Sequence, residues 1–180
     1  MAIYLRKLFF LTAVFFCFCL FNARGVSVTV TLHSKPYNFI TLHNGSQRIT
    51  MEDFAIDVSP GDPFLPTKVF SIALPPQADF STISLQIDHI EITELSGVYE
   101  IAPCPPLGIS LDGSNLVLWG KGKRIVDGRN MNVYGLNERF PDSAVHLLPY
   151  SQMRKWKFSK VEFYPFQYNP VSKKLYHIRS

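Results

Sequence analysis

The sequence is poor in cysteine. Three cysteines occur in 180 residues, and two of them, Cys17 and Cys19, lie in an apolar segment close to the N-terminus. A scaffold held by several disulfides is therefore excluded, because such a framework needs paired cysteines throughout the domain. The fold has to be held by a hydrophobic core instead, and a chain of this length can bury one.

The sequence also lacks the patterns of an enzyme. Its five histidines show no HxH or HxxxH spacing, so we expect no metal site and no cofactor. Cys104 lies between Pro103 and Pro105, and these prolines leave no backbone amides there for an oxyanion hole. The segment Gly120–Lys123 lacks the GxxxxGKS/T spacing of a phosphate-binding loop. We therefore predict that this chain has no catalytic residues and is not itself an enzyme.

No apolar run reaches the roughly 18–20 residues of a membrane-spanning helix. The longest, Leu8–Phe21, follows two basic residues and precedes Ala23 and Gly25. A basic start, a short apolar core and a small-x-small site predict a helical signal peptide over residues 1–25, cleaved after Gly25. The alternative is a retained N-terminal anchor. Export leaves a domain of residues 26–180 that is secreted, periplasmic or at the cell surface, with only transient membrane contact through the signal peptide.

A net excess of one charge sign is nearly absent once the signal peptide is removed. Three basic residues leave with it, so that 15 basic residues remain against 14 acidic ones. Export and this small net charge exclude a nucleic-acid partner. The distribution is uneven, however: residues 26–112 carry a net charge of −7 and residues 113–180 a net charge of +8. This asymmetry indicates either an interaction surface or two halves that neutralise each other within one fold.

Helical periodicity is scarce. No window of twelve residues has an apolar stripe at helical spacing, and 13 prolines would break most candidate helices. Alternating apolar residues instead predict an all-β domain, an antiparallel β-sandwich preceded by the signal helix, with one short helical turn near Tyr150–Arg154. The strands are expected at residues 26–32, 37–42, 54–58, 69–74, 83–92, 99–102, 116–119, 144–148, 156–164 and 175–178.

One segment, Trp119–Asn130, concentrates positive charge among glycines. It reads WGKGKRIVDGRN and holds Lys121, Lys123, Arg124 and Arg129. The glycine spacing predicts an exposed loop. Such a loop either presents a basic side chain to an acidic pocket of a partner or forms an ordinary solvated hairpin tip.

Three proline-containing segments follow one another at characteristic spacing. Residues 59–66 read SPGDPFLP and lead into the strand expected at 69–74 and then Pro75-Pro76. Residues 99–106 are rich in proline, and residues 161–170 read VEFYPFQYNP. In this order they resemble the N-terminal propeptide domain of gingipain-type cysteine peptidases, over roughly residues 50–180. The residues that carry the resemblance are Pro60, Gly61, Pro63, Leu65, Pro66, Pro75, Pro165, Tyr168, Asn169 and Pro170.

These motif residues have structural roles first. Prolines fix φ and stiffen an extended lead into a strand, and Asn169-Pro170 is typical of a turn. The ring of Tyr168 can be buried while its hydroxyl reaches a partner. We therefore expect the motifs to stabilise the fold more than to contact a partner.

The resemblance implies a function that composition does not. Such prodomains accompany a cysteine peptidase through export, assist its folding and hold it latent. In arginine-specific members a basic side chain from a prodomain loop occupies the specificity pocket. The counterpart here is the loop Lys121–Arg129, with Lys123 or Arg124 as the inserted residue. The partner is then the cognate peptidase domain, either downstream in a longer precursor or a separate chain.

A second functional interpretation, a binding module in place of a prodomain, stays open. The domain would then be a secreted β-sandwich that binds glycans or a cell surface. Its aromatic residues Trp119, Tyr134 and Trp156 would bind the glycans or the surface.

Overall fold

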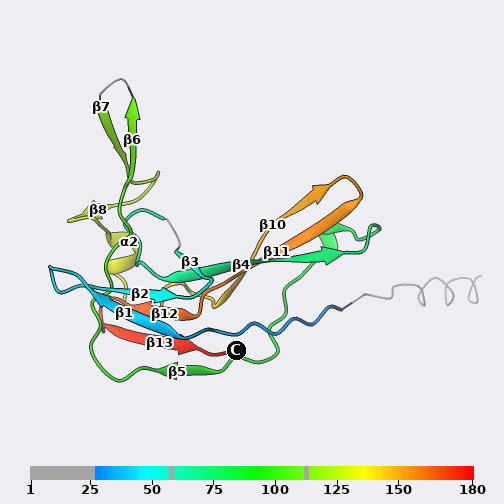
Figure 1. The fold of residues 1–180 in the computed structure, drawn as a ribbon, viewed down its shortest axis with the longest axis horizontal. Coiled ribbons are helices and arrows are strands. Elements are labelled where there is room, and N and C mark those ends of the chain that lie inside the picture. The colour runs from blue at the N-terminus through cyan, green and yellow to red at the C-terminus, as the bar shows by residue number, and fades with distance from the viewer. Residues whose placement is uncertain (1–26, 57–58, 112–113) are drawn as a thin grey trace, which may run out of the picture. The chain divides into compact units, whose positions relative to one another are not determined.

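The computed structural model describes residues 27–56, 59–111 and 114–180 (Figure 1). The chain forms two compact units, Met1–Thr31 and Leu32–Ser180. Of the first unit, residues 27–31 are described, and they are exposed and form no strand. The strand predicted at 26–32 is therefore wrong over its described residues, because alternation produces a strand only where a neighbour supplies backbone partners. The predicted signal helix lies outside the described residues.

The regular secondary structure of the second unit consists almost entirely of β-strands, and every pairing between its named strands is antiparallel. The predicted all-β antiparallel class is thus confirmed. The helical elements of the described residues are a 3-10 turn, η1 (Phe80–Thr82), and a four-residue helix, α2 (Met131–Tyr134). None of the described helices is long and apolar enough to cross a membrane. The strands are β1 (Tyr37–Thr41), β2 (Gln47–Met51), β3 (Ala55–Ile56), β4 (Pro66–Leu74), β5 (Ile92–Glu94), β6 (Leu107–Leu111), β7 (Ser114–Leu118), β8 (Ile125–Val126), β9 (Arg129–Asn130), β10 (Val145–Met153), β11 (Trp156–Phe163), β12 (Phe166–Asn169) and β13 (Lys174–Ile178).

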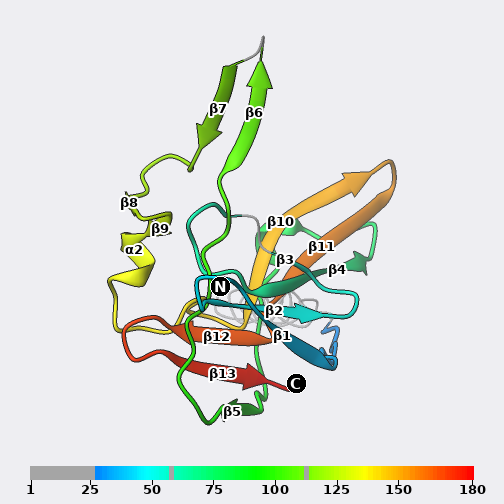
Figure 2. The same ribbon diagram turned by 60° about the vertical axis from the view of Figure 1, so that its left-hand side comes forward.

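Two larger sheets and three hairpins make up this unit (Figure 2). The four-stranded sheet has the order β10-β11-β4-β3, and the three-stranded sheet has the order β12-β13-β5. The strands β1 and β2, β6 and β7, and β8 and β9 pair as separate two-stranded hairpins. Along β11, Ser159, Val161 and Phe163 are buried and alternate with half-buried residues, which is the period-2 pattern of a strand with one face on the core.

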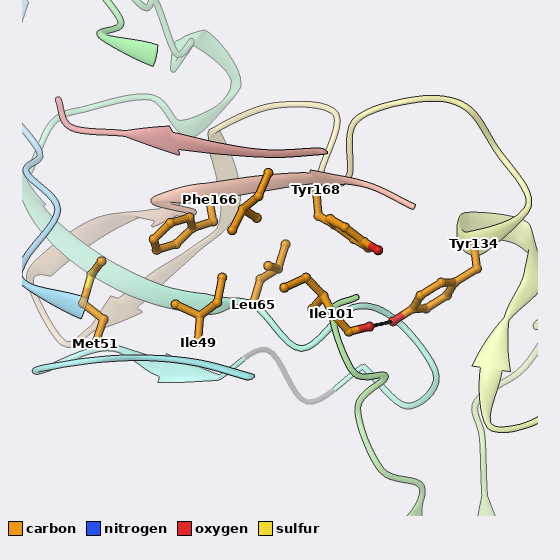
Figure 3. Packing of buried hydrophobic residues seen from close by; sticks show 8 residues of the cluster. Ile49, Met51, Leu65, Ile101, Tyr134, Phe166 and Tyr168 are labelled. Atoms are coloured by element: carbon orange, nitrogen blue, oxygen red, sulfur yellow. Dashed lines mark hydrogen bonds between the residues drawn. The ribbon is translucent and has the colours of Figure 1, made fainter. Parts of the chain in front are cut away.

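The main core lies between β2, β12 and the segments that precede β4 and follow β5. Figure 3 shows Phe166 and Tyr168 of β12 directed toward Ile49, Leu65 and Ile101. Burying each of these large side chains contributes about 1.5–3 kcal/mol relative to exposure. A second cluster joins the two larger sheets, because Phe163 of β11 and Ile178 of β13 both belong to it.

The structure corrects three further predicted elements. Residues 83–91 form no strand, and β5 begins only at Ile92. Residues 99–102 form no strand either, although Ile101 makes an isolated bridge to Gln47. The helical turn predicted near Tyr150–Arg154 is also wrong, because β10 continues to Met153 and a tight turn leads into β11.

The correction at β10 has a physical reason. Pro149 interrupts the alternation, and the pairing of β10 with β11 shifts in register between Leu148 and Ser151. An edge strand accommodates proline at such an irregularity, because the missing N–H costs no ladder bond there. The remaining predicted strands are confirmed with small changes of their ends, except that β10 extends five residues beyond the predicted end at Leu148. Those at 37–42, 69–74, 116–119, 144–148, 156–164 and 175–178 correspond to β1, β4, β7, β10, β11 and β13, and the described part of 54–58 contains β3.

Candidate functional site

Two of the proline-rich motifs lie side by side. Gly61 N–H donates to the carbonyl of Cys104 at 2.9 Å, and Cys104 N–H donates to the carbonyl of Asp62 at 2.7 Å. Phe64 N–H donates to the carbonyl of Ala102 at 2.9 Å. Cys104 is buried, and its backbone groups are used in this pairing. Residues 59–66 and 99–106 therefore form one platform, which we call the motif platform.

The basic loop is fastened to this platform through Asp62. The Lys123 ammonium donates to Asp62 Oδ2 at 2.9 Å, and it also donates to Ser59 Oγ and to the carbonyl of Pro60, both at 2.7 Å. An ammonium has three N–H donors, so each donor of Lys123 has an acceptor on the platform. The Lys123 and Asp62 side chains are only 16% and 11% exposed. Lys123 is therefore a tether of the loop rather than a side chain presented outward.

Asn130 fastens the other end of the loop to the same carboxylate. Its Nδ2 donates to Asp62 Oδ1 at 2.7 Å, and its backbone N–H donates to the carbonyl of Gly61 at 2.8 Å. Its Oδ1 accepts from Asn132 N–H at 3.1 Å and so caps α2. Satisfying an exposed helix N–H in this way typically contributes about 1 kcal/mol.

Gly61 allows the platform and the loop to approach. Its φ is +83°, a conformation that strains any L side chain. A Cβ at this position would lie 2.9 Å from Ile125 Cδ1 and 3.2 Å from the backbone nitrogen of Asn130. The glycine of the SPGDPFLP motif is therefore required by the docking of β8 and β9.

Between its two anchors the loop forms a tight hairpin of β8 and β9. Asp127 and Gly128, at the turn, have φ values of 48° and 76°. Positive φ at both central residues is the type I′ geometry that Asp-Gly favours in two-residue hairpins. Met131 N–H closes the base of the hairpin by donating to the carbonyl of Arg124 at 2.7 Å. The loop expected from the glycine spacing is thus a short, internally hydrogen-bonded hairpin.

Arg129 is also held by the fold. Its Nη2 lies 2.6 Å from Glu100 Oε1, and its guanidinium lies 5.3 Å above the ring of Tyr134. Glu100 binds Lys173 through its other oxygen at 2.7 Å. The Lys173 hydrogen bond, aided by the charges of both cations, lowers the pKa of Glu100 below its ordinary value.

The other two basic residues of the loop are presented to solvent. The side chains of Lys121 and Arg124 are exposed, and neither makes a hydrogen bond, ion pair or ring contact within the part of the chain that the structure describes. Of the four residues predicted for partner contact, the structure thus places Lys123 and Arg129 in internal contacts. It leaves Lys121 and Arg124 available to a partner.

The uneven charge distribution is neutralised in part inside the fold. Five ion pairs join an acidic residue of the first half to a basic residue of the second half. They are Asp62–Lys123, Glu100–Arg129, Glu100–Lys173, Glu94–Lys174 and Glu91–Arg179. The asymmetry between residues 26–112 and 113–180 therefore reflects interleaved segments in these five cases.

The remaining motif residues lie in the core or in turns of the fold. Leu65 and Pro66 are fully buried where β4 begins. Pro75 opens the turn after β4, since its carbonyl accepts from Ala78 N–H at 2.9 Å. Pro165 is buried between β11 and β12, and its carbonyl accepts from Ile178 N–H at 2.9 Å.

The Asn-Pro pair after β12 also forms a hydrogen-bonded turn. Asn169 Oδ1 accepts from the backbone N–H groups of Val171 and Ser172, each at 3.1 Å, while Pro170 is buried. Tyr168 donates its hydroxyl to the carbonyl of Tyr99 at 3.0 Å. Burial raises the pKa of Tyr168 to about 12.

The aromatic residues of the glycan-binding reading do not share one exposed face. Tyr134 lies in the core, and its hydroxyl donates to the carbonyl of Ile101 at 2.9 Å (Figure 3). Burial raises the pKa of Tyr134 above its ordinary value. Trp119 is half-buried near Gly128, and Trp156 is exposed at the start of β11. Among the described residues, no group of three or more histidine, cysteine or carboxylate side chains could hold a metal ion.

Sequence reasoning missed the anchors of the loop. Asp62, Asn130 and Glu100 position the basic hairpin, yet they are 29 to 68 residues away from the partners they bind. The sequence signal that could have revealed these anchors is the Gly61-Asp62 pair inside the SPGDPFLP motif. The glycine lets another backbone approach closely, and the neighbouring carboxylate can bind a basic side chain of that segment.

Comparison with known proteins agrees with this architecture. A chain of a solved structure described as "Complex of Porphyromonas gingivalis RgpB pro- and mature domains" is similar with a TM-score of 0.59 at 19% identity, covering 86% of this chain and 78% of that one. A second, described as "Structural insight into zymogenic latency of gingipain K from Porphyromonas gingivalis", has a TM-score of 0.54 at 16% identity, covering 79% and 75%. No curated protein matches the chain. The model of the Propeptide_C25 family matches residues 22–179, so this chain belongs to that family, and the resemblance drawn from its motifs is confirmed.

Proposed function

We propose that this chain is the exported prodomain of a gingipain-like cysteine peptidase. It binds the cognate peptidase domain, in the same precursor or as a separate chain, keeps it latent and assists its folding. The chain itself is not an enzyme. Family membership and the two similar prodomain structures support this function at the level of the fold.

The two larger sheets are the two layers of a β-sandwich in this proposal. Contacts between Phe163 of β11 and Ile178 of β13, with Phe70 of β4 packed against them, support such layering. Residues 1–25 act as the signal peptide, so that the domain works in the periplasm, at the cell surface or outside the cell.

The observation that carries the inhibitory role is the way in which the loop is held. Lys123, Asn130 and Arg129 tie the β8–β9 hairpin to the fold, while Arg124 stays exposed beside them with its carbonyl fixed by Met131 N–H. Holding a loop in its binding conformation before contact lowers the entropy lost on binding. A guanidinium is suited to bind a carboxylate through two parallel hydrogen bonds. Arg124 is therefore the residue that enters the specificity pocket, and Lys121 supports it at the rim.

The test is inhibition of an arginine-specific gingipain-type peptidase domain by the purified chain. Arg124→Ala is expected to weaken inhibition at least 30-fold, since truncating one partner of a buried, hydrogen-bonded charge pair costs about 2–5 kcal/mol. Arg139→Ala is the matched control, because Arg139 is also exposed but lies over the ring of Tyr176 away from the loop. Unchanged inhibition by a variant that lacks both Arg124 and Lys121 side chains would refute the loop assignment.

A further inference from the structure

A cluster of basic residues without a carboxylate partner lies at another place in the described fold, the hairpin of β10 and β11. Residues 145–161 contain Arg154, Lys155, Lys157 and Lys160 and no carboxylate. None of these four cations takes part in an ion pair within the described residues. This contrasts with the basic residues of β13 and of the basic loop that are paired with carboxylates from the first half of the chain.

The free end of the same hairpin also exposes large apolar side chains. Met153 is 66% exposed, Tyr150 58% and Trp156 51%. Met153 lies opposite Trp156 in the register, and Gln152 lies opposite Lys157. Because residues opposed in an antiparallel pair share a face, Met153 and Trp156 lie on one face of the hairpin. We call the segment Tyr150–Lys157 the hairpin tip (Figures 1 and 2).

The other face of the hairpin tip is buttressed by η1. The ring of Phe80 stacks on that of Tyr150, with centroids 3.8 Å apart and an interplanar angle of 8°. Lys157 Nζ donates to the carbonyl of Ala78 at 2.6 Å and lies 5.2 Å from the centre of the Phe80 ring. Asp79 supplies the only negative charge of residues 75–82, so the tip with its buttress keeps an excess of positive charge.

We propose that the hairpin tip docks on the surface of an anionic lipid bilayer. Indole and phenol rings favour the headgroup region of a membrane, and lysine and arginine reach from apolar surroundings to the lipid phosphates. The negative surface potential of such a bilayer strengthens binding about fivefold for each nearby cation. Met153 and Trp156 are exposed on one face of the tip, and Tyr150 on the other face stays 58% exposed although it stacks on Phe80. Exposed apolar side chains in both directions suit a medium that surrounds the tip. A protein partner seated on one face would leave the other face exposed.

This surface is distinct from the proposed inhibitory loop. The two differ in their residues, and they can be inactivated separately. The hairpin tip would hold the exported domain at a membrane surface while Arg124 and Lys121 remain free to engage the peptidase.

The experiment follows Trp156 on mixing the full chain with lipid vesicles. Trp119→Phe is the background, so that Trp156 is the only remaining tryptophan. Vesicles of phosphatidylcholine with about one third phosphatidylglycerol are expected to shift the Trp156 emission to shorter wavelength. Brominated acyl chains in those vesicles should quench it. Raising the salt concentration should weaken binding, since screening reduces the attraction. Because the readout belongs to Trp156, binding through the N-terminal apolar segment does not produce it.

Two tip variants test the contributions separately. Arg154→Asn with Lys155→Gln removes two charges, and asparagine tolerates the positive φ of 55° at position 154. It should lower the affinity for anionic vesicles about 25-fold. Met153→Ser leaves every charge in place and should reduce quenching by the brominated chains. The charge-matched control, Lys121→Gln with Arg124→Gln, should bind vesicles like the parent and lose inhibition of the peptidase.

Three results would overturn the proposal. The first is a Trp156 emission that anionic vesicles leave unchanged. The second is a tip variant that binds vesicles as the parent does. The third is an equal shift with dextran sulfate or with neutral vesicles, which would identify a soluble polyanion or a purely apolar surface as the partner. Since the tip variants keep Arg124, loss of vesicle binding with intact inhibition separates this proposal from the prodomain function.

Discussion

The tether between Lys123 and Asp62 makes a prediction that separates stability from inhibition. We consider the change Lys123→Met, which keeps a long unbranched side chain and removes the ammonium. Asp62 then keeps Asn130 as a donor, while Ser59 Oγ and the carbonyl of Pro60 lose the donor they share. Both charged side chains are mostly buried, with exposures of 16% and 11%.

The magnitude follows from these contacts. Breaking a fully buried ion pair by removing one partner costs about 3–5 kcal/mol, and the residual exposure of this pair places the loss at about 2–3 kcal/mol. For a domain of this size, each kcal/mol lowers the melting temperature by about 2–4 °C. The Lys123→Met variant should therefore melt about 5–10 °C lower. Urea unfolding followed by circular dichroism gives the free energy directly.

The control variant removes one positive charge, as Lys123→Met does, but at a side chain that makes no hydrogen bond or ion pair within the described part of the chain. Lys121→Met lies in the same loop, and because Lys121 is exposed the substitution should alter the free energy of unfolding by less than about 0.5 kcal/mol. Combining Lys123→Met with Asp62→Asn should show a coupling of at least about 1 kcal/mol, since the two side chains are in contact. A Lys123→Met variant that inhibits poorly but unfolds like the parent would refute the tether and make Lys123 the inserted residue.

Two further predictions concern Gly61 and His177. Gly61→Ala should destabilise the domain clearly more than Gly45→Ala in urea unfolding. Both glycines have φ near +80°, but an added Cβ meets the β8–β9 hairpin at Gly61 and open space at Gly45. Equal losses of unfolding free energy would contradict the docking of the hairpin. Burial lowers the pKa of His177 below 6.5 in the folded protein. As the pH falls, the unfolded chain therefore binds this proton before the folded chain does. The free energy of unfolding should decline from about pH 6.5 down to the folded pKa, by at most about 1.4 kcal/mol per pH unit. His177→Phe should flatten this decline, whereas substitution of the exposed His43 should leave it in place.

Strand prediction from alternation worked where one face of the strand is buried. In β11 every second residue near its end lies in the core, and this period of two is visible in the sequence. It failed at residues 83–90, which also alternate over Ile83–Asp88 but form no strand. Backbone pairing begins only at Glu91, whose N–H donates to the carbonyl of Ser180 and whose carbonyl accepts from Arg179 N–H. It also missed β12, since Phe166, Gln167 and Tyr168 are all buried and show no alternation.

The sequence by itself determined the class of the domain and its family. Proline spacing, turn residues and strand alternation are local properties, so an antiparallel all-β chain with prodomain motifs can be recognised without coordinates. Four basic residues in the loop could likewise be identified as candidates for partner contact.

Only the tertiary structure decided which of those four residues are available. Lys123 is bound by an aspartate 61 residues earlier, and Arg129 by a glutamate 29 residues earlier. The basic residues of the hairpin tip could likewise be identified in the sequence. The structure was needed to show that they form no ion pair among the described residues. The physical reason is common to both cases. The strength of a charge's interaction is set by what folding brings within a few ångströms of it, and separation along the chain does not reveal that distance.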